Sequence, residues 1–512
     1  MTSLLSSFAL PATSIAARLP EDVPPEGILV GWSMEKSHIR QPMGFSYGNG
    51  GGRAASGYVD PILLENEGHL ITIAPTGSGK GVGCIIPALL RHTGPAIVID
   101  PKGENALVTA RRRRELGQDV VVVDPMGITG LPSGSINPLD LIDPYSPSGV
   151  DEAVAVVSAL LPATLGEGRN SYWINRARQL LLSTILHLVT DLPPQDRTLF
   201  TLRNLIGALT SDREDLIERF KASLHPEVRL GANDLGLQAH ETFGGIVSFA
   251  QEGVDFIRGP QIHEATRTTS FPLDSVTRGD PLTIFIVLPP HMMESHARLL
   301  RLWVSTLLKL ITRRRARPPR PTLFLLDEAA QLGPLDELRT AITLLRGYGL
   351  QTWSFWQDTS QLKALYPIDW ATMVNNCKVF QAFGANNLSA AQDVSRLVGF
   401  VSAETFLGLE NNEMLLQIAG DEAVVAQVPN YRTDPVFSGQ FDENPLFEPG
   451  TDPVPERVIL REYIRPERRV VAPAQQIPPS AAARGPGPSN AIDAMIADAL
   501  LDLFAQRADD PP

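Results

Sequence analysis

The clearest pattern along the chain is a series of short, continuous apolar runs separated by stretches with helical periodicity. Runs of this length, rich in Val, Ile, Leu and Phe, are typical of parallel strands that are covered on both faces of a sheet. The predicted strands are His69–Ile73, Ala96–Asp100, Val120–Asp124, Thr283–Leu288, Thr322–Asp327 and Gln351–Phe355. The pattern therefore predicts an α/β fold with a mainly parallel central sheet.

The pattern changes between the third and the fourth predicted strand. Residues 146–275 contain helical repeats, such as Tyr172–Leu188 and Leu202–Leu209, and few strand-like runs. Pro and Gly in this region mark helix ends and turns. We predict an all-α domain at 146–275 that is inserted into the sheet domain, whose two parts are then 45–145 and 276–439.

Both ends of the chain differ from this core. Residues 1–44 mix small, polar and apolar positions and predict an N-terminal arm without a transmembrane helix, and a Gly-rich loop at 45–60 leads into the first strand. Residues 440–512 predict a Pro-rich acidic tail. The tail ends in an amphipathic helix, capped by Ser489 or Asn490, whose apolar face packs on the body of the protein or on another chain.

Composition narrows the class of protein. The 512 residues are 43% hydrophobic and 6% aromatic, enough to bury a sizeable core, and Cys84 and Cys377 match no disulfide or metal-site spacing. This cysteine usage indicates a reducing compartment, the cytoplasm. No apolar run approaches the roughly 20 residues of a membrane-spanning helix.

Charge sets a limit on how the protein can bind nucleic acid. A net charge of −13 argues against coating of DNA over the whole surface, but a local basic channel is compatible with it. Two arginine clusters can be either such a channel or solvated helix ends. They are Arg111–Arg114 and the group Arg313, Arg314, Arg315, Arg317 and Arg320.

The strongest chemical signal is the segment APTGSGKGVG at 74–83, which follows a predicted strand and precedes a helical stretch. In a Gly-rich loop of this kind, backbone N–H groups and the positive end of the helix bind phosphate, and Lys80 reaches the outer phosphates. The usual Ser or Thr after the lysine, which binds Mg²⁺, is Gly81 here, so Thr76, Ser78 or water would take its place. The predicted nucleotide-binding residues are Pro75, Thr76, Gly77, Ser78, Gly79, Lys80, Gly81 and Val82.

A second acidic element is needed to complete a site for ATP and Mg²⁺. The run TLFLLDE is an apolar strand that ends in Asp327 and Glu328. In P-loop ATPases the first acid holds Mg²⁺, here through water, and the following Glu can accept a proton from the attacking water. The two segments together predict a nucleotide-binding domain that hydrolyses ATP.

Several motifs in order resemble the type IV secretion coupling proteins, the TraG-like conjugative DNA-transfer ATPases. They are APTGSGKGVG, VIDPKGEN, INPLD, YWINRARQLL, FLLDEAAQLGPL and RGYGLQTWSFWQDTSQL, between about residues 68 and 430. The resemblance implies a RecA-like P-loop fold in which Gly81 is common, Gln357 lies beside the γ-phosphate and Arg346 reaches the ATP of a neighbouring subunit. It also implies that the all-α domain faces the incoming substrate.

The resemblance further implies a homo-hexameric ring with a central channel for DNA, predicted to be single-stranded. Its expected partners are a relaxase or other transfer proteins, and the secretion-channel ATPases or inner-membrane components. Members usually begin with a transmembrane region, which is not found in this sequence, so we expect a cytoplasmic protein or one held at the inner membrane by a partner. Thr266–Ser275 matches the family pattern loosely.

Two other functions remain open at this stage. One is a DNA translocase of the FtsK or HerA kind outside secretion, and the other is an adaptor that binds ATP and recruits protein substrates. Asp100 and Asp124, which follow predicted strands, either lie near phosphate or cap loops. The nine histidines show no metal-binding spacing, and Trp353, Trp356 and Trp370 are predicted to be core residues.

Overall fold

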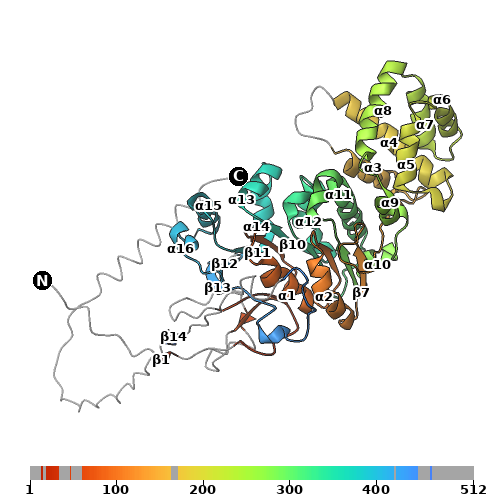
Figure 1. Cartoon of the computed structure of the whole chain (residues 1–512). Coiled ribbons are helices and arrows are strands. Elements are labelled where there is room, and N and C mark those ends of the chain that lie inside the picture. Colours follow the sequence, from red (N-terminus) through yellow and green to blue (C-terminus); the bar gives the residue numbers. More distant parts are fainter. Residues whose placement is uncertain are drawn as a thin grey trace, which may run out of the picture. The chain divides into compact units, whose positions relative to one another are not determined.

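The fold is seen in a computed structural model, which describes residues 13–14, 19–33, 46–47, 60–162, 171–399, 401–419, 423–447 and 462–463 (Figure 1). All of these residues belong to one compact unit, Met1–Ile464. Most of the predicted Pro-rich tail at 440–512, including its terminal helix, lies outside the described residues. Among the described residues, no helix is both long and apolar enough to cross a membrane.

A twelve-stranded sheet forms the centre of the molecule, in the order β3-β4-β2-β13-β12-β11-β5-β10-β9-β6-β8-β7. The strands from β11 to β7 are parallel, and β12, β13, β2, β4 and β3 continue the sheet with antiparallel pairing. Their bounds are β2 Ile28–Trp32, β3 Ser46–Tyr47, β4 Pro61–Leu64, β5 His69–Ile73, β6 Ala96–Ile99, β7 Asp119–Val123, β8 Leu282–Ile286, β9 Thr322–Leu326, β10 Leu350–Trp356, β11 Cys377–Ala382, β12 Glu413–Ile418 and β13 Val424–Gln427. A separate pair joins β1 Thr13–Ser14 to β14 Glu462–Tyr463.

All six predicted strands are confirmed as β5 to β10, and the sheet is covered on both faces. Alternation along β9 shows this, because Phe324 and Leu326 belong to one hydrophobic cluster, and Leu323 and Leu325 belong to another. The first cluster contains residues of α11 and α12, and the second contains residues of α1 and the start of α2. Trp353 and Trp356 are fully buried in β10, and Trp370 packs against the core.

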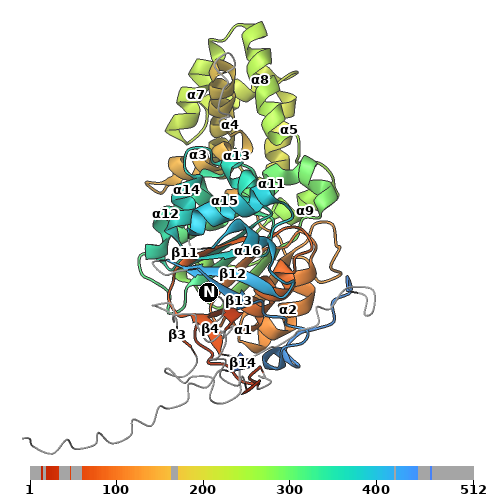
Figure 2. The ribbon, with the colours of Figure 1, turned by 90° about the vertical axis from the view of Figure 1, so that its left-hand side faces the viewer.

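The helical insertion lies in the chain between β7 and β8. Helices α4, α5, α7 and α8 gather in one cluster (Figure 1, Figure 2), with α4 packed on α7 and α8. The helices of the insertion are α3 Gly149–Leu160, α4 Ser171–Asp191, α5 Leu199–Ala208, α6 Arg213–Lys221, α7 Pro226–Gly236, α8 His240–Val254, α9 Pro260–Arg267 and α10 Leu273–Arg278. The helices of the sheet domain are α1 Ile86–Arg91, α2 Glu104–Glu115, α11 Pro290–Thr312, α12 Asp336–Leu344, α13 Thr359–Leu365, α14 Trp370–Asn376, α15 Leu388–Val398 and α16 Ala403–Leu407.

The prediction of an N-terminal arm at 1–44 is wrong for Ile28–Trp32, which form strand β2. Every residue of β2 is buried, and the strand pairs with β4 and β13 inside the large sheet. Burial of the apolar run ILVGW against two distant strands makes this segment part of the core. The sheet domain therefore begins before residue 45.

The predicted start of the tail at residue 440 is also too early. Asp442 N donates to Val108 O at 3.0 Å, and Arg111 Nε donates to the Asp442 carboxylate at 2.6 Å. The buried residues Val436 and Phe437 join Val108 in a third hydrophobic cluster. These contacts attach residues 436–442 to α2, so the folded domain extends past 440.

Candidate nucleotide site

Parallel pairing brings the ends of three strands to one edge of the sheet. β10 lies between β5 and β9, with Trp356 beside Ile73 and Ser354 beside Leu326. The loop 74–81 follows β5, Asp327 and Glu328 follow β9, and Gln357 follows β10. Ligands of open α/β sheets bind at this carboxyl edge.

The glycine-rich loop is shaped to bind an anion. Gly77 and Gly79 have φ of +81° and +87°, values that side chains other than Gly rarely adopt. A Cβ added at Gly77, Gly79 or Gly81 would meet no atom within 4 Å, so the backbone there borders open space. The amides of Gly77, Gly79 and Lys80 have no hydrogen-bond acceptor within the described part of the chain, which leaves them available for phosphate.

The start of the following helix is unusual. Residues Gly81–Ile85 form a π-helical turn before α1, and such turns are frequent at functional sites. Gly83 lies against the segment after β13, since a Cβ there would come within 2.2 Å of Val428 Cγ1. Tyr431 N donates to Val82 O at 3.4 Å. Sequence reasoning missed this support because β13 is more than three hundred residues away and carries no motif.

Lys80 contacts both acidic residues at the end of β9. Its Nζ lies 3.1 Å from Asp327 Oδ1 and also bonds to Glu328 Oε1. Burial acts to lower the pKa of Lys80, but the charges and hydrogen bonds of the two acids outweigh it and raise that pKa above its ordinary value. Burial raises the pKa of Asp327, against the lowering effect of Lys80.

Besides its bond to Lys80, Glu328 has a second side-chain partner and an unusual backbone conformation. Its second carboxylate oxygen, Oε2, accepts a hydrogen bond from Gln357 Nε2 at 3.0 Å. Its backbone has φ 58° and ψ 53°, the one non-glycine residue with positive φ in the described ranges. Strained backbone of this kind clusters at functional sites. The backbone N–H of Gln357 is itself fixed by Gln361 Oε1 at 2.9 Å, a contact that the sequence analysis did not include.

Asp100 and Asp124 have structural partners. Asp100 accepts hydrogen bonds from Ala106 N at 2.8 Å and Asn105 Nδ2 at 3.1 Å, so it holds the first turn of α2. Burial raises the pKa of Asp100 to about 7. Asp124 accepts from the N–H and the hydroxyl of Thr129, both at 2.8 Å. These contacts favour the capping interpretation for both residues.

Arg346 does not join this group within one chain. It is exposed and precedes β10, whereas Gln357 follows β10. A strand of seven residues spans about 20 Å at a rise of about 3.3 Å per residue. Arg346 therefore lies at the amino edge of the sheet. There, burial lowers the pKa of His69, and the charge of Arg346 lowers it further.

The two arginine clusters are largely engaged in the fold. Arg113 is fully buried, donates to the carbonyls of Leu89, His92 and Gly94, and bonds to Thr283 Oγ1 at 2.9 Å. Arg314 donates to five further groups, among them Gly349 O at 3.0 Å and Thr322 Oγ1 at 2.7 Å. Five members are exposed: Arg114, Arg313, Arg315, Arg317 and Arg320. Two of them form ion pairs, Arg313 with Glu152 and Arg317 with Glu67. Arg113 and Arg314 therefore have structural roles, whereas the exposed members keep their charge at the surface.

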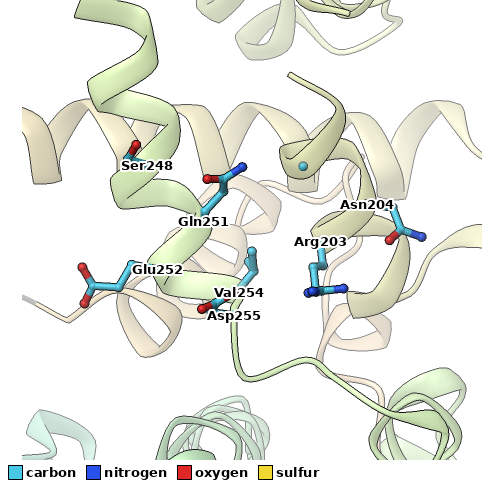
Figure 3. A pocket seen from close by; sticks show the side chains of 8 residues that line it. Arg203, Asn204, Ser248, Gln251, Glu252, Val254 and Asp255 are labelled. Carbon is cyan, nitrogen blue, oxygen red and sulfur yellow. The ribbon is translucent and has the colours of Figure 1, made fainter. Parts of the chain in front are cut away.

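A separate cleft of about 570 Å³ lies between α5 and α8 in the insertion. Arg203 and Asn204 come from one helix, and Gln251 and Glu252 come from the other (Figure 3). Glu252 pairs with Arg298 of α11 at 2.9 Å. The cleft is polar but shares no residue with the loop 74–83. In the part of the chain that the structure describes, no three His, Cys, Asp or Glu side chains are grouped to hold a metal by themselves.

Comparison with known proteins now identifies the family. The family described as type IV secretory system conjugative DNA transfer matches residues 31–406. The conjugal transfer protein TraG of Escherichia coli is 28% identical over 372 residues, 68% of this chain and 58% of that protein. The coupling protein VirD4 of Bartonella quintana is 24% identical over 67% of this chain and 55% of its own length. The chain thus spans less than two thirds of these relatives.

A solved structure gives the same fold. The bacterial conjugative coupling protein TrwBdeltaN70 superposes with a TM-score of 0.57 at 18% identity, over 72% of this chain and 86% of that one. The predicted RecA-like P-loop architecture is therefore confirmed. With the family match extending over most of the sheet domain and the whole insertion, the chain belongs to the type IV secretory system conjugative DNA transfer family.

Proposed function

We propose that this protein is an ATP-hydrolysing motor or substrate receptor that couples DNA, with or without bound protein, to a type IV secretion or conjugation channel. The observation that carries the proposal is the convergence of Lys80, Asp327, Glu328 and Gln357 beside an open glycine loop. Supporting it, the plasmid coupling protein TrwB has been solved in complex with ADP and Mg²⁺.

Each residue has a role that follows from its position. The free amides at Gly77, Gly79 and Lys80 bind the phosphates, and the Lys80 ammonium moves from the two acids to the outer phosphates. Glu328, released from Lys80, accepts a proton from the attacking water. Gln357 orients Glu328 through its amide, at the end of the strand between the loop and the acids.

The residues present fit a magnesium ion. Asp327 offers a carboxylate at the edge of the open loop, and it holds the ion through water in our proposal. Gly81 has no hydroxyl, and Ser78 Oγ donates to Pro75 O at 2.7 Å, which leaves its lone pairs free, while Thr76 is exposed. When bound, Mg²⁺ neutralises charge on the phosphates.

The assembly and its partners belong to the same proposal. We infer a homo-hexameric ring in which Arg346 of one subunit reaches the ATP of the next, because Arg346 is exposed and distant from Lys80 within the chain. The substrate is single-stranded DNA, delivered with a relaxase or other transfer protein. Secretion-channel ATPases or inner-membrane components hold the ring at the inner membrane.

Turnover with and without DNA tests the proposal. Glu328→Gln keeps the size of the side chain and removes the proton acceptor, so kcat falls by about 10²–10⁴-fold. Glu337→Gln, the same chemical change on the nearby α12, leaves kcat close to the wild-type value. An adaptor that only binds ATP would show negligible turnover in all three proteins. Absence of DNA-stimulated hydrolysis where a ring forms would reject the motor.

A further inference from the structure

Two chain segments connect the sheet domain to the helical insertion, and they pair with each other. Ile136 N donates to Ala265 O at 2.9 Å, and Ser270 N donates to Ser135 O at 3.0 Å. Residues 135–140 and 265–270, hereafter the crossing, therefore form one hydrogen-bonded unit. It is the place where the chain passes in both directions between the sheet domain and the insertion.

The motif INPLD fastens this crossing with side chains. Asn137 Nδ2 donates to Arg197 O at 2.8 Å and to Arg267 O at 3.3 Å. Asp140 Oδ2 accepts from Thr269 N at 2.9 Å and from Thr269 Oγ1 at 2.8 Å. Asn137 is buried, so its amide contacts join both segments to the base of α5 with little competition from water. The contacts of Asp140 with Thr269 lie at the surface.

Helix α11 contacts the crossing from the sheet domain. Trp303, fully buried, donates from Nε1 to Ile136 O at 2.9 Å. At the end of the helix, Arg313 Nη2 donates to Leu141 O at 2.7 Å and pairs with Glu152 of α3 at 2.5 Å. A 23-residue helix is stiff over its length, so these points move together.

The other side of α11 contacts the acidic end of β9. Arg301 Nε donates to Leu332 O at 3.2 Å. Leu332 ends the short 3₁₀ turn Ala329–Leu332, which starts at the left-handed Glu328. Arg301 and Trp303 are two residues apart, so they point to different sides of the helix. Glu328 and Ile136 are therefore connected through one turn, one helix and two hydrogen bonds.

We propose that α11 transmits the nucleotide state from the Glu328 turn to the crossing, with Arg301 and Trp303 as positioning residues. The inference rests on the proposed function. In the structure Lys80 and Gln357 hold both oxygens of Glu328. When phosphates attract Lys80, Glu328 loses its ion pair and the strained turn relaxes. The Leu332 carbonyl shifts, and α11 follows through Arg301.

Amide hydrogen exchange with Mg²⁺ and a non-hydrolysable ATP analogue tests this transmission. In the wild type the analogue protects residues 74–83 and changes exchange in the crossing by about fivefold or more, within the usual range of coupling between sites. Trp303→Phe keeps an aromatic ring but removes the indole donor. It loses the change in the crossing and keeps protection of residues 74–83. Its basal turnover stays near wild type, while stimulation by DNA is lost.

A matched control is Trp32→Phe. Trp32 is also fully buried and donates its indole N–H to Asp434 Oδ2 at 2.8 Å, but on β2, away from the crossing. We expect Trp32→Phe to retain the change in hydrogen exchange that the ATP analogue causes in the crossing. Arg301→Lys, which keeps the charge and removes the Nε donor, loses the response as Trp303→Phe does.

The outcomes separate the two proposals. If the analogue protects residues 74–83 but the crossing does not respond in the wild type, or responds equally in Trp303→Phe, transmission through α11 is refuted and the ATPase proposal stands. If basal and stimulated turnover fall together in Trp303→Phe, the residue is only structural and the inference is overturned. If the analogue does not bind at all, the proposed function fails, and the inference with it.

Discussion

Replacing Gly77 by alanine separates the phosphate-binding role of the loop from its backbone strain. Gly77 has φ +81°, and a Cβ added there meets no atom within 4 Å. The methyl group therefore clashes with nothing in the protein. It forces an L-residue into a left-handed conformation, and it occupies open space beside amides that have no acceptor of their own.

The chain offers a close control in Gly117. It also has φ +81° and no atom within 4 Å of a built Cβ, but it follows the C-terminal end of α2. Both substitutions cost about 1–2 kcal/mol of stability, the cost of the left-handed region for an L-residue. In Gly77→Ala the phosphates also lose a charge-assisted hydrogen bond, about 1.5–3 kcal/mol. That loss weakens nucleotide binding by roughly 10- to 150-fold.

Titration with a fluorescent ATP analogue and Mg²⁺, together with urea unfolding, measures the two effects separately. We expect the same loss of stability in both variants and a loss of affinity in Gly77→Ala alone. Equal affinity in Gly77→Ala and Gly117→Ala would refute the phosphate-binding role of the loop. A much larger loss of stability in Gly77→Ala would show that the loop is held by contacts beyond its backbone conformation.

Two further predictions concern the amino edge of the sheet and acid stability. We expect Arg346→Ala to keep nucleotide affinity near wild type and to lower kcat by at least about tenfold in the assembled ring. The reason is that the cation acts on charge that develops in a neighbouring subunit. Equal kcat values in Arg346→Ala and in Arg315→Ala, a control at another exposed arginine, would contradict this. Burial and the charge of Arg113 lower the pKa of His92 to about 3. Between pH 6.5 and 4, His92 therefore becomes protonated only in the unfolded chain, and the stability of the protein falls as the pH falls. From pH 6.5 to 5 we expect the free energy of unfolding, measured in urea, to fall by about 2 kcal/mol more in the wild type than in His92→Asn. Asp100 has the opposite effect on stability, but it is present in both proteins and cancels in the comparison. An identical pH dependence of the wild type and His92→Asn would exclude a buried neutral His92.

The sequence predicts the parallel half of the sheet well for a physical reason. Strands β5, β6, β8, β9 and β10 are buried along their whole length, so most of their positions are apolar and the signal is local. The site could be placed for the same reason, since a polar motif directly after a buried strand must lie at the carboxyl edge. Asp327 and Gln357 directly follow such strands, and Lys80 lies in the polar loop after β5.

The antiparallel half was missed because its signal is not local. β2 and β13 are short, and they pair with each other although they lie almost four hundred residues apart in the chain. The parallel strand β11 was missed as well, because it begins with Cys377 and Lys378, which interrupt the apolar pattern. Likewise, nothing in Val428 or Tyr431 indicates that they support the turn after Lys80. Such contacts are set by tertiary packing rather than by local preference.

The hydrogen-bond and ion-pair partners within the site could not be predicted from the sequence. A motif places Lys80 near phosphate, whereas the structure has it bound to Asp327 and Glu328, because an ammonium beside two half-buried carboxylates pairs with them. The same register that gathers these groups at one edge keeps Arg346 at the other, a strand length from Gln357. A direct role for Arg346 at the phosphates therefore requires a second copy of the chain. In the proposed mechanism, the ion pair of Lys80 with Glu328 is a state that nucleotide must break before hydrolysis can begin.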